Sequence, residues 1–291
     1  MTEVEIIPAS HHDGPEARLL RKRSLELNEY AGWAGVAIEI RSTPAFRSFL
    51  DNIATASDAE LNLESKKATS PAAFKKMLEV LRMNAIDGIP SYPIDIDESP
   101  RSELMMKLFD RAFCESNDML LRPGPIKSRM DAAITMLKAM HDYDSFREEA
   151  MFDNIIRIVN GRPYGGVLVV CGATHCRPLL RALLDTGYDV DLAGGRMLSS
   201  NVDYGNIIFE ARESAVALGS YQDCDGRSEL KIARFVLAMD FGIPAAPDII
   251  KVSSMAEAEN MRRERMYLIT KLYRPALPDR GLARLKSAAG Y

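Results

Sequence analysis

The chain has 291 residues, of which 47% are hydrophobic and 27% are charged, so it can bury a sizeable core. Its net charge of −4 gives no reason to expect nucleic acid or an anionic membrane as partner. No apolar run reaches the length of about 18 residues that a transmembrane helix requires, and we therefore expect no membrane span.

The N-terminus and the cysteines bear on the compartment. The first residues, from Met1 to Glu5, are acidic and lack the basic and apolar regions of a signal peptide. This predicts a cytoplasmic protein, or one exported without such a signal. The cysteines are scattered without a C-x-x-C pair, and we expect four free thiols: Cys114, Cys171, Cys176 and Cys224.

Strand and helix patterns alternate over the first hundred residues. The segment 3–7 is rich in β-branched residues and predicts a strand that Pro8 ends. A third strand is predicted over 92–97, where Pro93 argues against a central position in a sheet. The polar segment 58–70 is expected to be a loop or excursion. The other predicted elements are a strand over 35–40 and helices over 15–30, 46–53 and 72–85.

Three helices are predicted next, over 102–113, 127–143 and 144–159. Arg147 lies on the apolar stripe of the third one. A guanidinium in that position is expected to face the edge of the core, where it needs an acidic partner.

An unbroken apolar run over 167–171 predicts a strand buried on both faces of a parallel sheet. Gly172 follows it, and Pro178 suits the first turn of a helix. His175 is therefore expected in a strand-to-helix loop at the carboxyl end of a central strand, where open α/β sheets bind their ligands. The alternative is that His175 only caps or packs locally.

The remaining elements are a strand over 188–192 and helices over 230–239 and 255–272. The alternation predicts an α/β fold over residues 1–200, with a mainly parallel central sheet flanked by helices. Residues 201–291 are expected to form a mostly helical C-terminal extension packed on it. The last helix is dense in charge, which fits a solvated appendage or an oligomer contact, and a homodimer stays an open alternative.

Proton-active side chains follow several of the predicted strands. The first strand is followed by His11-His12-Asp13, the second carries Glu39, the third carries Asp95, and the fourth precedes His175. Parallel strands would bring all of them to one edge of the sheet, within reach of Arg147. Such a group can bind a divalent metal or perform metal-free acid–base chemistry. No G-x-S-x-G elbow and no phosphate-binding glycine loop is present.

These motifs resemble the superfamily that contains Tiki/TraB proteins, erythromycin esterases and ChaN-like haem-uptake proteins. The resemblance runs in order over residues 3–195. Its parts are Ala9-Ser10-His11-His12-Asp13, Ile38-Glu39-Ile40, Gly88-Ile89-Pro90 through Asp95, Arg147-Glu148-Glu149-Ala150-Met151 and Gly172-Ala173-Thr174-His175. One departure stands out, because Ala9-Ser10 replaces the Gly-Glu that precedes the first histidine in the family.

The resemblance implies a hydrolase acting on an ester or amide bond of a small molecule or peptide. His12 or His175 would be the general base, Glu39 would orient it and Arg147 would stabilise the oxyanion, with Glu148 in the same catalytic group. Contacts to the substrate are expected from His11, Asp13, Asp95 and Gly172.

Two other functions stay open, a binder of haem or another small ligand with histidine or tyrosine as axial ligand, and a toxin-like member with altered chemistry. We expect metal-free chemistry. If a divalent metal is used, the expected ligands are His12, Glu39 and His175.

Overall fold

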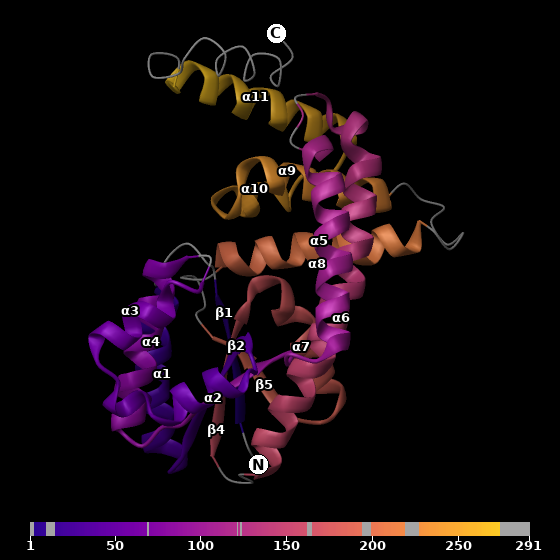
Figure 1. Ribbon diagram of the computed structural model, residues 1–291. Coiled ribbons are helices and arrows are strands. Elements are labelled where there is room, and N and C mark those ends of the chain that lie inside the picture. Colours follow the sequence, from indigo (N-terminus) through magenta and orange to yellow (C-terminus); the bar gives the residue numbers. More distant parts are fainter. Residues whose placement is uncertain are drawn as a thin grey trace. The chain divides into compact units, whose positions relative to one another are not determined.

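The computed structural model describes residues 3–9, 15–68, 70–120, 122, 124–161, 165–193, 199–218 and 227–273 (Figure 1). The chain divides into two compact units. The first comprises residues 1–103 and 144–205, and the second comprises residues 104–143 and 206–291. The expected boundary at residue 200 is close to the break at Gly205, but the second unit also takes in the helical segment 104–143.

The first unit contains a five-stranded, all-parallel sheet with the strand order β3-β2-β4-β1-β5. This confirms the predicted α/β fold with a parallel sheet flanked by helices. Because β2 and β1 both pair with β4, the apolar strand β4 is central, as its sequence predicts. The strands are β1 (Glu3–Ala9), β2 (Ala34–Arg41), β3 (Ser91–Asp95), β4 (Gly166–Gly172) and β5 (Asp189–Leu192).

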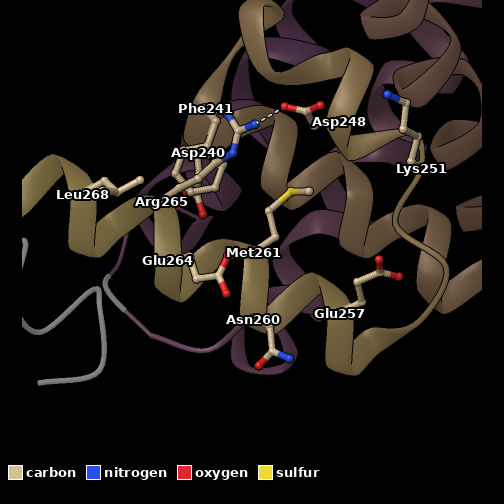
Figure 2. Close-up of a pocket in the computed structure, with 10 residues that line it drawn as sticks. All are labelled: Asp240, Phe241, Asp248, Lys251, Glu257, Asn260, Met261, Glu264, Arg265 and Leu268. Atoms are coloured by element: carbon tan, nitrogen blue, oxygen red, sulfur yellow. Dashed lines mark hydrogen bonds and ion pairs between the residues drawn. The ribbon is translucent and has the colours of Figure 1, made fainter.

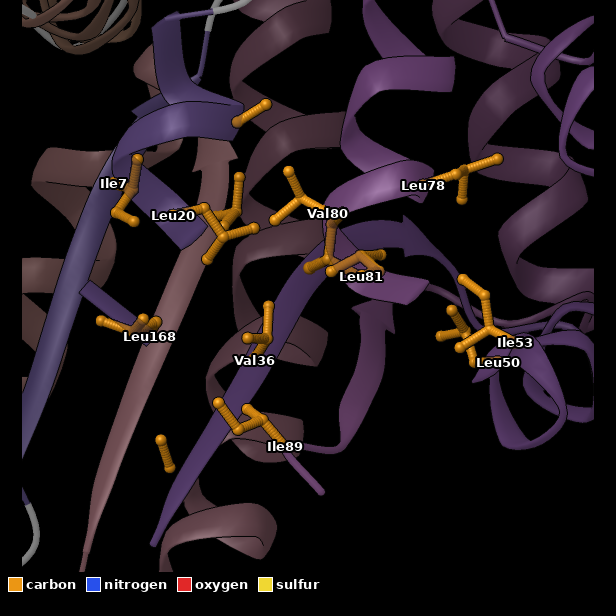
Figure 3. Packing of buried hydrophobic residues seen from close by; sticks show 14 of the residues in the cluster. Ile7, Leu20, Val36, Leu50, Ile53, Leu78, Val80, Leu81, Ile89 and Leu168 are labelled. Carbon is orange, nitrogen blue, oxygen red and sulfur yellow. The ribbon is translucent and has the colours of Figure 1, made fainter. Parts of the chain in front are cut away.

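Side chains of β4 alternate between two hydrophobic clusters, one on each face of the sheet. Leu168 and Val170 pack with α1 (Pro15–Ala31), α2 (Pro44–Asp51) and α4 (Pro71–Ile86). Figure 3 shows this cluster, with side chains from β1, β2 and β4 meeting those of α1 and α4. Val167, Val169 and Cys171 pack on the other face with α6 (Met130–Gly161) and α7 (Ala173–Asp185). The period-two alternation thus buries both faces of the strand.

Pro8 does not end the first strand, contrary to the prediction. β1 continues to Ala9, and Pro8 lies opposite Cys171 of β4. The pairing with β5 on the other side of β1 stops at Ile6. Proline is tolerated here because that side of β1 has no ladder partner at Pro8, so the missing N–H leaves no ladder bond unmade.

The segment predicted to be a loop over 58–70 contains a helix, α3 (Asp58–Ser65). The Ser57 hydroxyl accepts a hydrogen bond from the Glu60 N–H, and the Glu60 carboxylate accepts one from the Ser57 N–H. This capping box satisfies the backbone donors of the first turn. Leu61 is fully buried in the same cluster as Leu168 and Val170, and Asp58 pairs with Arg82 of α4 at 2.9 Å. A cap, an apolar anchor and an ion pair thus hold this short polar helix.

The helices predicted over 127–143 and 144–159 form one helix, α6, which the short 3₁₀ turn η2 (Ile126–Arg129) precedes. No proline or glycine interrupts α6 before Gly161, so nothing ends the helix near Asp144.

The start of α7 also differs from the prediction. The helix begins at Ala173, directly after β4, and Pro178 lies inside it. His175 therefore lies in the first turn of a helix instead of a loop, so its position is fixed by helical geometry.

The described secondary structure of the second unit consists of helices joined by short turns. The helix predicted over 102–113 extends to Leu120, and one helix around residue 201 went unpredicted. The elements are α5 (Pro100–Leu120), α8 (Ser199–Ala217), α9 (Arg227–Phe241), η4 (Ile243–Ala245), α10 (Ala246–Ile249) and α11 (Met255–Tyr273), of which α5 and α8 begin in the first unit. Among the described helices, none combines the length and hydropathy that a membrane span requires.

Candidate functional site

The strand order brings three functional groups to the carboxyl edge of the sheet. Glu39 lies near the end of β2 and Asp95 ends β3, the neighbour of β2 on one side. Gly172 ends β4, the neighbour of β2 on the other side, and His175 follows it in the first turn of α7. The prediction that Glu39, Asp95 and His175 meet at one edge is confirmed.

Arg147 of α6 joins these groups through its guanidinium. Its Nε lies 3.1 Å and 3.2 Å from the two carboxylate oxygens of Asp95, and its Nη2 lies 2.7 Å from Asp95 Oδ2. The same Nη2 donates to Glu39 Oε1 at 2.5 Å. Burial alone would lower the pKa of Arg147, but the negative charges of Glu39 and Asp95 raise it above its usual range. Arg147 is therefore a permanent cation, and its pairing with acids agrees with the prediction.

Glu39 is held ionised although its side chain is only 10% exposed. Its second oxygen, Oε2, accepts a hydrogen bond from the Gly172 backbone N–H. Burial tends to raise the pKa of Glu39. The charges of His175 and Arg147 and the Gly172 N–H outweigh that effect, so the pKa lies below its ordinary value. The result is a fixed carboxylate anion at the sheet edge.

His175 is buried behind this carboxylate, with 3% of its side chain exposed. Its Nδ1 lies 2.9 Å from Glu148 Oε1, and its Nε2 lies 3.1 Å from Arg147 Nη1 and 3.5 Å from Glu39 Oε1. A guanidinium only donates, so in neutral His175 the Nε2 accepts from Arg147 and the proton sits on Nδ1, which donates to Glu148.

The charge state of His175 depends on the same neighbours. Burial lowers its pKa, but Glu39 and the hydrogen bond to Glu148 act more strongly and raise it overall. When His175 is protonated, Nε2–H can donate only to Glu39, because Arg147 does not accept. In both states Nδ1 keeps its proton toward Glu148. We name Glu39, Asp95, Arg147, Glu148 and His175 the arginine cluster.

A cavity of about 740 Å³ opens onto one side of the arginine cluster. Glu39, Asp95, Arg147 and Gly172 line it, whereas His175 and Glu148 are not among its lining residues. An apolar wall comes from Phe46 and Phe74, whose ring centroids are 6.5 Å apart, together with Met77. A substrate in this cavity would meet Glu39 directly and His175 only through Glu39 and Arg147.

His11, His12 and Asp13, which the sequence placed at the site, lie outside the described residues. The described chain on either side of them does reach the cavity, because Ala9 and Glu16 both line it. Asp144, which was not among the predicted site residues, also belongs here, because its Oδ1 lies 3.9 Å from Arg147 Nη1. Its position one helical turn before Arg147 and Glu148 was the available signal.

A metal site can be tested against these contacts. Among the described residues, His175 Nδ1 and carboxylate oxygens of Asp144 and Glu148 lie within 4.8 Å of one another. Nδ1 donates its proton to Glu148 in this arrangement, so an ion could bind there only with release of that proton. The predicted set of His12, Glu39 and His175 includes one residue outside the described range, and Nε2 of His175 already faces the Arg147 cation.

The second unit has a cavity of its own, of about 960 Å³, between α9, α10 and α11 (Figure 2). Arg265 pairs there with Asp248 at 2.6 Å, and Asp240 is held by Arg129 and Arg262. The described residues that line it include no histidine, cysteine, serine or threonine.

Comparisons of the chain with protein-family models, with curated proteins and with solved structures found no match.

Proposed function

We propose that the protein is a hydrolase of an ester or amide bond, related to the Tiki/TraB and erythromycin-esterase superfamily, and that it acts at the cavity beside the arginine cluster. The observation that carries this proposal is Glu39. Its carboxylate is kept ionised by Arg147 and His175, is oriented by the Gly172 N–H, and lines a cavity large enough for a small molecule. A fixed anion in such a place can orient water or a histidine for proton transfer.

The role of each side chain follows from which of its hydrogen-bonding atoms are already engaged. Both nitrogens of His175 are engaged, so His175 positions Glu39 and Arg147 and does not touch the substrate. Arg147 directs its Nε and Nη2 hydrogens at Asp95 and Glu39, so it acts through the acids it holds and not as an oxyanion donor. We assign the general base to His12, which lies in the sequence between Ala9 and Glu16, two residues that line the cavity.

The proposed reaction is addition of water to the substrate carbonyl carbon. His12 takes a proton from the water as the new C–O bond forms. The bond to the alcohol or amine then breaks, and His12 returns the proton to that leaving group. Glu39 stabilises the imidazolium form of His12 between these two steps. The apolar wall of Phe46, Phe74 and Met77 binds the uncharged part of the substrate.

Haem binding is the weaker alternative. The ionised pair of Glu39 and Arg147 at the cavity instead suits a polar reaction.

The test is hydrolysis of a panel of p-nitrophenyl esters and p-nitroanilides by the purified full-length chain. We expect Glu39→Gln and His12→Ala each to lower kcat/KM by a factor of about 10² to 10⁴. His141→Ala removes a histidine of the second unit and should leave kcat/KM unchanged. Folded Glu39→Gln and His12→Ala variants with wild-type kcat/KM would overturn the proposal, as would a wild-type chain that hydrolyses no member of the panel.

A further inference from the structure

Two buried cysteines lie in contact next to the arginine cluster. Cys171 is the penultimate residue of β4, and Cys176 lies in the first turns of α7. Their sulfurs are 3.6 Å apart, and the residues are only 1% and 3% exposed. The sequence predicts both as free thiols, because no C-x-x-C spacing marks them and four residues lie between them. The sharp change from strand to helix at Gly172 brings them together.

We propose that Cys171 and Cys176 form a redox-sensitive dithiol, which a hydroperoxide converts reversibly into an intrachain disulfide beside the candidate site. A disulfide requires an S–S distance of about 2 Å, so each sulfur has to move by less than about 1 Å from the observed contact. Rotation about side-chain bonds supplies movements of this size. Cys171 also lines the cavity of the first unit, which gives a small oxidant a path to the pair.

Hydrogen peroxide would oxidise the dithiol in two steps. One thiol loses its proton, and its sulfur attacks the peroxide O–O bond, which yields a sulfenic acid and one water. The second sulfur then displaces the hydroxyl group of the sulfenic acid, which forms the S–S bond and releases a second water. The two sulfurs lose two electrons and the peroxide gains them. A dithiol reductant reverses the change by thiol–disulfide exchange.

The two buried thiols are protected from oxidation at neutral pH. The hydrogen bond with Cys176 and burial raise the pKa of the Cys171 thiol well above its ordinary value, and the negative charges of Glu39 and Glu148 add to the effect. Because the thiolate is the form that reacts, oxidation is expected to be slow at pH 7 and faster at pH 9.

The disulfide would act on the candidate site through Gly172. Cys176 Sγ lies 3.6 Å from the Gly172 carbonyl oxygen, and the Gly172 N–H holds Glu39. Cys176 is also the direct neighbour of His175. Drawing the two sulfurs together shifts the junction of β4 and α7, and with it the carboxylate that lines the cavity. This regulatory consequence rests on the proposed hydrolase function, whereas formation of the disulfide does not.

The test uses the full chain with Cys114→Ser and Cys224→Ser, so that only the dithiol remains. The protein is treated with hydrogen peroxide at pH 7 and at pH 9, denatured, alkylated and digested with trypsin. Both cysteines fall on one peptide, residues 158–181, because the intervening arginines precede proline. We expect this peptide to escape alkylation and to lose two hydrogens, about 2 Da, with full recovery after dithiothreitol.

Variants with Cys171→Ala or Cys176→Ala in the same background provide the control, because neither can form the bridge. Two alkylatable thiols after complete exposure to peroxide, or sulfinic acid on one cysteine without a bridge, would overturn the dithiol. We further expect the bridge to lower kcat/KM on the best p-nitrophenyl ester by a factor on the order of ten to a hundred, since displacements near 1 Å have such effects.

The outcomes separate the two proposals. A bridge that forms in a chain without hydrolytic activity in either redox state removes the proposed function and leaves the dithiol. Hydrolysis that requires Glu39 in a chain that never forms the bridge removes the dithiol and leaves the function. A bridge that forms without any change in kcat/KM overturns the link between the dithiol and the site.

Discussion

Arg147 and Asp95 form a bidentate ion pair although they lie 52 positions apart in the chain. The guanidinium donates hydrogen bonds from Nε and Nη2 to both oxygens of the carboxylate, at 2.7 to 3.2 Å. Asp95 ends the edge strand β3 and Arg147 lies on α6, so the pair ties the sheet to the helix on one of its faces. The same guanidinium reaches Glu39 on β2, which makes it the common partner of two strand ends.

Replacement of Arg147 by alanine should destabilise the protein strongly. It leaves Glu39 and Asp95 buried without their cation, and breaking a buried pair in this way costs about 3 to 5 kcal/mol. Arg147→Lys keeps the positive charge but cannot form the bidentate hydrogen bonds, so its free energy of unfolding should lie between those of the alanine variant and the wild type. Urea unfolding measures the effect. Arg111→Ala removes an exposed ion pair with Glu115 on α5 and should change the free energy of unfolding by less than about 1 kcal/mol. Equal effects of the two alanine variants would contradict this account.

The pH dependence of stability should report His175. Its pKa in the folded protein lies above the ordinary value of 6.5. The fold thus favours the protonated form, and the stabilisation is complete below about pH 6.5 and is lost as the pH rises through the folded-state pKa. We expect the difference in unfolding free energy between wild type and His175→Gln to shrink above pH 6.5. His141→Gln is the matched control, and a wild-type advantage over His175→Gln that grows with rising pH would refute the assignment.

Ionised Glu39 should make the protein less stable as the pH falls, which is the opposite dependence on pH. Its pKa in the folded protein lies below the ordinary value of 4.5, so its contribution is present above pH 4.5 and is lost as the pH falls through the folded-state pKa. Glu39→Gln should therefore flatten the acid side of the stability profile. Urea titrations between pH 3 and pH 6 test this, and unchanged acid sensitivity in the variant would show that other groups control it.

Gly205 on α8 permits a close approach to the start of α7. A Cβ at this position would lie 2.0 Å from the Ala173 carbonyl oxygen, a backbone atom that cannot move aside. Gly205→Ala should therefore cost at least about 1 to 3 kcal/mol and disturb the helix that carries His175. Gly161→Ala is the matched control, because a Cβ there meets nothing within 4 Å. Thermal unfolding of both variants distinguishes the clash from a general effect of alanine.

The capping box of α3 can be tested in the same way. Ser57→Ala removes the side-chain acceptor for the Glu60 N–H and should cost about 1 kcal/mol. Asn62→Ala changes an exposed position within the same helix, where alanine is the better helix former, and should not destabilise the protein. Similar losses in both variants would mean that the cap does not hold the helix.

Elements with a local signal could be predicted from the amino-acid sequence. The apolar run of β4 required burial on both faces, and Pro93 restricted β3 to an edge of the sheet, where it lies. The carboxyl ends of parallel strands meet at one edge whatever their order, so the sequence alone assigns Glu39, Asp95 and His175 to one site. The apolar stripe likewise predicted that Arg147 would find an acid.

Which side chains are in contact depends on the packing of the strands and helices. The strand order places β2 beside β4, and only then does Glu39 reach the Gly172 N–H. The turn from β4 into α7 brings Cys176 against Cys171, and it encloses His175 between Glu148 and Arg147. Contacts of this kind join residues far apart in the chain or in different elements. Their geometry depends on how whole strands and helices pack, and no local pattern of residues encodes it.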